Sequence, residues 1–282
     1  MKTKKNDDPQ YDPAAVTAYF DDLAEKEWER MVADPFAEVR HHVHTHYLRE
    51  HVPPEARVLD IGAGPGRYTQ LLAEMGCTIT VADISPTQLA LNQDNAHRLG
   101  FAGAVAAWHQ LDICHMMELA DATFDTVLAY GGPLSYVLDA REQALQECMR
   151  VTRPGGLLLF GVMSLWGSAH MALRGVMKIP PETNEIIIRT GDLTVETMPN
   201  SRHYCHMFRA AELRAFLDRP ALNLLALSAS NVLSTNWPNL LAEIREDEQK
   251  WSELLRMEVE AGAEPGCLDM GTHLIAVVEK AR

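Results

Sequence analysis

The stretch "LDIGAGPGRYT", Leu59 to Thr69, decides the fold of this chain. An apolar run and a carboxylate lead into three glycines at alternate positions, Gly62, Gly64 and Gly66. Glycines between a strand and a helix let the backbone bend sharply and approach a ligand closely, next to the free N–H groups of the helix. The stretch therefore predicts a site for a nucleotide-like ligand.

Short apolar runs alternate with helical patterns on both sides of this stretch, as a parallel sheet covered by helices on both faces requires. The pattern predicts strands at 57–61, 78–83, 104–110, 124–130, 156–162, 222–227 and 272–279. It predicts helices at 13–31, 36–50, 67–75, 86–99, 116–119, 140–151, 210–217 and 240–261. The segment "NEIIIRTGDLTVE", residues 184–196, reads as a further strand.

The composition of the chain indicates which kinds of partner and which cell compartment are expected. The 282 residues carry 39 Asp and Glu against 25 Lys and Arg, a net charge of −14, which disfavours nucleic-acid binding. Five cysteines without a CxxC pair are typical of reduced thiols in a cytoplasmic protein. No apolar segment follows the N-terminal lysines, so we expect no secretory signal. The first ten residues are polar, and we expect them to be mobile. The uncharged run at 155–173 is interrupted by Ser164, Gly167, Ser168 and His170, so we expect a buried strand running into a loop or helix there and no membrane span. We expect a monomer or homodimer.

The glycine spacing separates the candidate ligands, which are nicotinamide dinucleotides, flavins, phosphates and S-adenosylmethionine. A dinucleotide fingerprint needs its third glycine where this chain has Arg67. Here the third glycine comes one residue early, and Asp60 precedes the turn. A pyrophosphate would be repelled by that carboxylate, whereas the cationic end of S-adenosylmethionine would not.

Acidic residues also stand at the ends of the second and third predicted strands. Asp83, in "TVADISP", is placed to accept hydrogen bonds from two ribose hydroxyls. Asp112 and Ile113, in "HQLDI", are placed to accept from an exocyclic amine and to cover an adenine face. Each acidic residue alone would be interpreted as a strand-end cap. Asp60, Asp83 and Asp112 together, at the ends of the first three predicted strands, favour a nucleoside site.

These motifs resemble the class I S-adenosylmethionine-dependent methyltransferases of the small-molecule group, over roughly Tyr19 to Val162. "FDTVLAYGGPLSYV" and "MRVTRPGGLLLFG" extend the resemblance. It implies a Rossmann-like, doubly wound, mostly parallel seven-stranded sheet with an antiparallel last strand at its edge. It also implies S-adenosylmethionine as cofactor, contacted by Tyr19, Asp60, Gly62, Gly64, Gly66, Asp83, Ile84, Asp112, Ile113, Tyr130 and Gly131.

The chain then divides into four parts. We expect an N-terminal helical cap over 1–52, the cofactor-binding core over 53–162, a substrate lid over 163–207, and completion of the sheet over 208–282. The lid holds Met163, Met171, Met177, Met198 and Met207, which predict an adaptable apolar pocket.

The acceptor segment "YGGPLSY", Tyr130 to Tyr136, differs from the Asn-Pro-Pro-Tyr type that resembles methylases of bases and amides. We predict that Tyr130, Tyr136, Trp166 and Tyr204 contact the substrate. His203, His206 and Tyr136 are the candidate catalytic residues, with either histidine as a base or as a hydrogen-bond donor to the substrate.

A second histidine group, "RHHVHTHYLREH", places His41, His42, His44 and His46 on one predicted helix. His42 and His46 share a face, but no Asp or Cys completes a ligand set, so we predict no metal site.

The sequence thus predicts an enzyme that transfers a methyl group from S-adenosylmethionine to a small, partly apolar acceptor by in-line displacement. One alternative is a regulatory module that binds the cofactor without transfer. The other is a nicotinamide-dependent oxidoreductase, which the third glycine disfavours.

Overall fold

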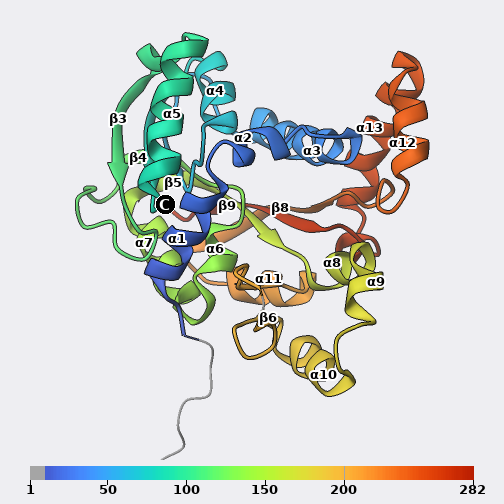
Figure 1. Ribbon diagram of the computed structural model, residues 1–282. Helices are drawn as coiled ribbons and strands as arrows, with labels where there is room; N and C mark the ends of the chain where they lie inside the picture. Colours follow the sequence, from blue (N-terminus) through green and yellow to red (C-terminus); the bar gives the residue numbers. More distant parts are fainter. Residues whose placement is uncertain (1–9, 200) are drawn as a thin grey trace, which may run out of the picture.

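The computed structural model describes residues 10–199 and 201–282, so the expectations for residues 1–9 and for Asn200 lie outside the described residues. A seven-stranded sheet forms the centre of the molecule, with strand order β3-β2-β1-β4-β5-β9-β8 (Figure 1). Its strands are β1 (Arg57–Ile61), β2 (Thr78–Asp83), β3 (Val105–Gln110), β4 (Phe124–Ala129), β5 (Thr152–Met163), β8 (Leu222–Ser230) and β9 (His273–Lys280).

The first five strands are mutually parallel, and β9 pairs antiparallel with both β5 and β8. The predicted fold class, a Rossmann-like sheet with an antiparallel last strand, is therefore confirmed. The expected edge position of that strand is wrong, because β9 inserts between β5 and β8 and leaves β8 at the edge. The insertion gives the more apolar strand a partner on both sides, as its "LIAVV" sequence suits.

Helices cover both faces of the sheet. They are α1 (Pro13–Leu23), α2 (Lys26–Arg30), α3 (Pro35–His51), α4 (Arg67–Glu74), α5 (Pro86–Leu99), α6 (Pro133–Tyr136), α7 (Arg141–Val151), α8 (Leu165–Met171), α9 (Leu173–Val176), α10 (Pro181–Thr190), α11 (Ala210–Leu217), α12 (Pro238–Arg245) and α13 (Glu248–Ala263). Three 3-10 turns lie at Ala102–Ala104, Leu138–Ala140 and Leu268–Met270.

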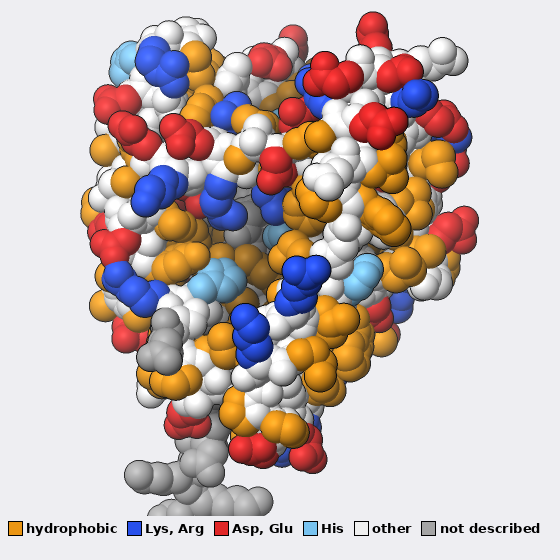
Figure 2. All heavy atoms as spheres, turned by 45° about the vertical axis from the view of Figure 1, so that its right-hand side comes forward, with side chains coloured by type: hydrophobic (Ala, Val, Ile, Leu, Met, Phe, Trp, Pro, Cys, Tyr) orange, Lys and Arg blue, Asp and Glu red, His pale blue; other side chains and the backbone are white. Residues whose placement is uncertain are grey.

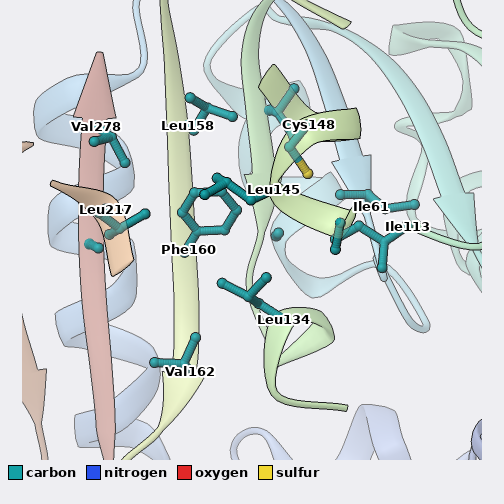
Figure 3. Packing of buried hydrophobic residues seen from close by; sticks show 14 of the residues in the cluster. Ile61, Ile113, Leu134, Leu145, Cys148, Leu158, Phe160, Val162, Leu217 and Val278 are labelled. Carbon is teal, nitrogen blue, oxygen red and sulfur yellow. The ribbon is translucent and has the colours of Figure 1, made fainter. Parts of the chain in front are cut away.

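The core consists of two apolar layers, one on each face. One layer packs α7 and α11 on the sheet around the fully buried Phe160, with Leu145 and Leu217 closing over it (Figure 3). The other packs α3, α4 and α5 on the opposite face, with Leu48 and Leu72 fully buried. Burial of both faces accounts for the continuous apolar runs of the sequence.

Several predicted elements differ from the structure. The helix expected at 13–31 breaks at Ala24, which has a φ of 44°, and the one at 240–261 restarts at the N-cap Asp247. The strand expected within 184–196 is instead largely helix α10, which Gly191 ends with a φ of 80°. Ile187 is buried, while Ile186 and Ile188 are each about 40% exposed. A helix that buries one isoleucine of the run is therefore favoured over the strand that three consecutive β-branched residues would prefer.

The segment 163–207 contains α8, α9, α10 and a two-stranded ribbon of β6 (Asp192–Leu193) and β7 (Cys205–His206). Its inner side packs against Tyr136 and the N-terminal Val16 and Phe20. Met163 and Met207 contribute to that packing, but Met171 and Met177 are 44% and 74% exposed. The expectation that all these methionines line one pocket is wrong for the latter two, because they lie on the outer side of the segment.

Candidate functional site

A cavity of about 590 Å³, including its open mouth, lies at the carboxyl ends of β1, β2, β3 and β4. The lining comes from the N-terminal helices, the glycine-rich loop and the strand ends: Tyr11, Val16, Phe20, Glu27, Ile61, Gly62, Gly64, Asp83, Ile84, Leu111, Asp112, Ile113, Gly131, Pro133, Tyr136 and Val137. The tertiary structure thus gathers Gly62, Gly64, Asp83, Ile84, Asp112, Ile113, Gly131 and Tyr136 from the sequence prediction around one cavity.

The glycine-rich loop has positive φ angles, which residues with side chains rarely adopt. Gly62 has a φ of 68°, and a Cβ placed on it would lie 2.4 Å from Cγ of Pro133. Gly64 has a φ of 53° and contributes to the cavity wall. Gly66, at the N-cap of α4, packs against Asn92 and does not line the cavity.

Asp83 ties the end of β2 to the glycine-rich loop. Its Oδ2 accepts a hydrogen bond from the Gly64 N–H at 2.8 Å, and its Oδ1 accepts from the Ser85 N–H at 2.9 Å. Burial raises the pKa of Asp83 to about 6, and the nearby charges of Glu27 and Asp21 act in the same direction. The carboxylate therefore shapes the loop while it lines the cavity.

Asp60 lies behind the loop and outside the cavity lining. Its side chain is almost fully buried, and its Oδ2 accepts a hydrogen bond from the Thr69 hydroxyl at 2.7 Å. Burial raises the pKa of Asp60 to about 7. The structure thus shows Asp60 orienting helix α4 and does not place it against the expected methionine end.

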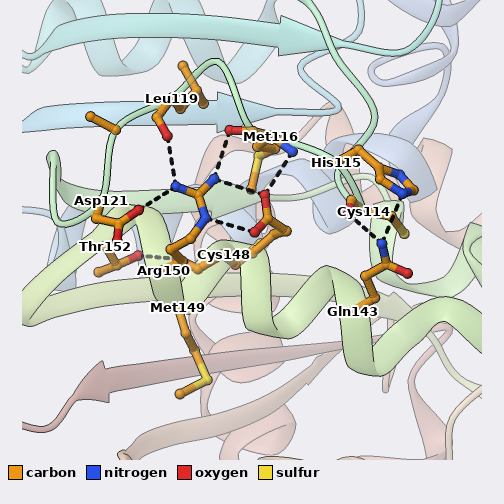
Figure 4. Close-up of polar contacts among 12 residues, drawn as sticks. Cys114, His115, Met116, Leu119, Asp121, Gln143, Cys148, Met149, Arg150 and Thr152 are labelled. Atoms are coloured by element: carbon orange, nitrogen blue, oxygen red, sulfur yellow. Dashed lines mark hydrogen bonds and ion pairs between the residues drawn. The ribbon is translucent and has the colours of Figure 1, made fainter.

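The loop after β3, which carries Asp112 and Ile113, is held against α7 (Figure 4). Arg150 donates to the carbonyls of Met116 and Leu119 at 2.8 Å, and it pairs with Asp121. The helix predicted at 116–119 is absent there, because these carbonyls bind a side chain of α7 and do not continue a helical ladder.

The N-terminal helices line one side of the cavity through Val16, Phe20 and Glu27. Sequence reasoning missed Tyr11 and Glu27, which line it from the segment before α1 and from α2. Tyr11 donates its backbone N–H to Asp139 at 2.7 Å, and burial beside Asp112 raises the pKa of its phenol. No local motif marks either residue, since a long-range contact brings each to the cavity.

Tyr136 and His203 form a hydrogen-bonded pair beside the cavity. The Tyr136 hydroxyl lies 2.9 Å from Nε2 of His203, and the Tyr19 ring lies 5.4 Å from the imidazole, centroid to centroid. Burial raises the pKa of Tyr136 well above its ordinary value. Burial and the charge of Arg30 lower the pKa of His203. The pair therefore consists of a neutral phenol and a neutral imidazole.

Several predicted site residues lie elsewhere. Tyr130 is buried in the layer formed by α3 and α4, between the rings of Tyr68 and His44, and does not line the cavity. Trp166 is 42% exposed and contacts the Arg209 guanidinium. The Tyr130 ring packs close to Gly161 of β5, where a Cβ would lie 3.3 Å from its Cδ1.

The remaining two candidates occupy different surroundings. Tyr204 lines a second, smaller pocket together with Tyr19 and Tyr136, next to the main cavity. His206 is clamped between Asp192 at 2.7 Å and Glu212 at 2.8 Å and does not line either pocket. Despite its burial, these two hydrogen bonds raise the pKa of His206. Its geometry is that of a structural imidazolium between two carboxylates.

The histidines of α3 separate into different surroundings. His44 is buried and bonded to the Arg40 carbonyl, His41 stacks on Tyr68, and His46 pairs with Glu50. Within residues 10–199 and 201–282, no three His, Cys, Asp or Glu side chains gather to hold a metal ion. No helix in this described part of the chain is long and apolar enough to cross a membrane.

Comparisons with known proteins agree with this geometry. Residues 59–160 match the family described as "Methyltransferase domain". Malonyl-[acyl-carrier protein] O-methyltransferase of Enterobacter lignolyticus is 36% identical over 109 residues, 39% of each chain. Demethylmenaquinone methyltransferase of Renibacterium salmoninarum is 28% identical over 167 residues, 54% of this chain and 60% of that one. The alignment with the malonyl-[acyl-carrier protein] enzyme thus spans only about two fifths of the length of that protein.

Solved structures share the fold over nearly the whole chain. 1,6-Didemethyltoxoflavin-N1-methyltransferase of Burkholderia thailandensis, solved with 1,6-didemethyltoxoflavin and S-adenosylhomocysteine, has a TM-score of 0.59 at 16% identity, covering 100% of this chain and 99% of that one. The [4+2]-cyclase SpnF has a TM-score of 0.61 at 17% identity, covering 98% and 99%. Residues 59–160 thus match a methyltransferase domain, and the chain as a whole shares the fold of solved S-adenosylmethionine-dependent methyltransferases.

Proposed function

We propose that this chain binds S-adenosylmethionine in the cavity and transfers its methyl group to a small, partly apolar acceptor. The cavity itself carries the proposal, because it joins the glycine-rich loop to Asp83, Asp112 and Ile113 at the ends of three adjacent strands. A ligand lying across these strand ends would meet the glycine-rich loop after β1 first. It would then meet Asp83 at the end of β2, which can accept from a ribose, and Asp112 and Ile113 after β3, which can contact an adenine.

The residues present fit this cofactor. Asp83 would accept hydrogen bonds from the ribose hydroxyls, while Ile113 would cover the adenine and Asp112 would accept from its amine. Gly62 and Gly64 line the cavity with backbone atoms and would lie beside the methionine end, and their positive φ angles disfavour residues with side chains. When bound, S-adenosylmethionine supplies an electrophilic methyl group on a sulfonium.

The Tyr136–His203 pair would serve the acceptor. Methyl transfer by in-line displacement depends chiefly on positioning, and a base is needed only where the nucleophile carries a proton. His203 is neutral, and its Nε2 faces the Tyr136 hydroxyl, so the pair can take up a proton released by an O–H or N–H nucleophile. We further propose that segment 163–207, which packs on Tyr136 through Leu165 and Cys205, acts as the lid over this acceptor.

Calorimetry with S-adenosylmethionine and S-adenosylhomocysteine tests cofactor binding. Dissociation constants at or below the order of tens of micromolar are expected for such an enzyme, and no binding in that range would overturn the proposal. Incubation with methyl-labelled cofactor and a metabolite extract then tests transfer. The fold also serves a [4+2]-cyclase, so binding without any labelled product would favour a non-methylating role.

A further inference from the structure

Arg40, on the inner side of helix α3, is a cation to which the described part of the chain offers no partner. It stands one turn before His44, whose Nδ1 lies 2.9 Å from the Arg40 carbonyl oxygen, and the adjacent Val39 and Val43 are fully buried. Its guanidinium makes no hydrogen bond or ion pair with the residues that the structure describes. Arg40 is half-buried, and this burial lowers its pKa, a sign that the charged group is partly desolvated. A desolvated cation without a partner is unfavourable unless a ligand supplies the counter-charge.

This side of α3 faces the end of the sheet where the acceptor is expected. The His44 ring lies 6.0 Å from the His273 ring, centroid to centroid, and a Cβ on Gly161 would lie 3.3 Å from Nε2 of His44. His273 pairs with Met163 at the carboxyl end of β5. Figure 2 shows a hollow in the middle of one face, with Lys and Arg side chains around it and a histidine inside.

The charges around Arg40 leave one positive charge uncompensated. Arg30 forms two hydrogen bonds to Glu27, so this pair is neutral as a unit. Burial lowers the pKa of His44 to about 3 and that of His273 well below its ordinary value, and the charges of neighbouring cations lower both further. These imidazoles are therefore neutral at pH 7. The nearby Asp34 is exposed and accepts the Ala37 N–H as the N-cap of α3.

We propose that the methyl acceptor is a monoanion whose carboxylate pairs with Arg40. This inference rests on the proposed methyl transfer and specifies the class of its substrate. A guanidinium matches a carboxylate through two parallel hydrogen bonds, and one uncompensated charge matches one anionic group. The rings of Tyr19, Tyr136 and His203 lie together beside the cavity and favour an aromatic body for the acceptor.

Benzoate and its neutral counterpart benzamide test the proposal. Protein saturated with S-adenosylhomocysteine should bind benzoate, followed by calorimetry, at least about tenfold more tightly than benzamide, as loss of a charge-assisted pair implies. Arg40→Met should abolish this preference, Arg40→Lys should retain part of it, and Arg174→Met, on the exposed surface of α9, should leave it intact. Thermal unfolding checks that each variant folds.

Three results would overturn the inference. The first is equal affinity of the wild-type complex for benzoate and benzamide, which needs no variant. The second is an undiminished preference in folded Arg40→Met. The third is a loss of about tenfold or more in S-adenosylhomocysteine affinity in Arg40→Met, which would assign the arginine to the cofactor's own carboxylate. Failure of the wild-type protein to bind S-adenosylhomocysteine would instead overturn the proposed function.

Discussion

Replacing Asp83 by Asn tests the cofactor site most directly. Both carboxylate oxygens accept a backbone N–H, from Gly64 and from Ser85. An amide keeps one acceptor and turns its NH₂ toward the other donor, so one N–H loses its partner, at a cost of about 1–3 kcal/mol in the free energy of unfolding. The ribose would also lose hydrogen bonds to a charged group, worth about 1.5–3 kcal/mol, so cofactor affinity should fall about 10- to 150-fold.

Calorimetric titration with S-adenosylhomocysteine measures this loss, and its pH dependence adds a second readout. Asp83 carries a proton below its pKa of about 6, so wild-type affinity should rise as pH increases through 6. Asp83→Asn should abolish that rise. Asp125→Asn is the matched control, because Asp125 also accepts a backbone N–H, from Arg57, at the amino end of β1. An unchanged dissociation constant in Asp83→Asn, with the control also unchanged, would refute the ribose assignment.

Four further substitutions test the surrounding structure. His203→Ala and Tyr136→Phe should slow methyl transfer at least about tenfold with little change in S-adenosylhomocysteine affinity, and the opposite pattern would count against their acceptor role. Gly62→Ala should lower the free energy of unfolding by about 2 kcal/mol or more, measured in denaturant, because its Cβ would meet Pro133 at a φ of 68°; wild-type stability would contradict the strain argument. Arg150→Ala should cost about 1–3 kcal/mol in unfolding free energy and weaken cofactor binding, since the loop after β3 would lose its tie to α7. Unchanged affinity in this variant would show that the loop keeps its position without the arginine.

Much of the fold followed from local pattern. Observed bounds lie within a residue or two of the predicted ones for the helices predicted at 67–75, 86–99 and 210–217 and for strands such as Arg57–Ile61 and Thr78–Asp83. The reason is that apolar runs and the caps Gly66, Ser85 and Gly100 act over a few residues. The isoleucine run of α10 was misread for the same reason, since its local preference pointed to a strand while its burial required a helix.

Some residues of the candidate site could be predicted from the sequence, and others could not. The glycine-rich loop, Asp83, Asp112 and Ile113 were recognisable because parallel strands present their carboxyl ends at one edge, so residues at those ends converge by topology alone. The neighbours of each side chain were not recognisable. His203 reaches Tyr136 across 67 residues, whereas His206, three positions later, turns into the Asp192–Glu212 clamp.

By itself the sequence determined the class of sheet and the loop that faces the ligand, because glycine spacing and alternating hydrophobicity are local properties of the chain. The tertiary structure alone decided that β9 lies inside the sheet and that Tyr11 and Glu27 reach the cavity from the N-terminal segments. It also left Arg40 half-buried, with no hydrogen bond or ion pair to its guanidinium from residues 10–199 and 201–282. Each of these depends on contacts between residues far apart in the chain, where packing and desolvation, and not local preference, determine the free energy.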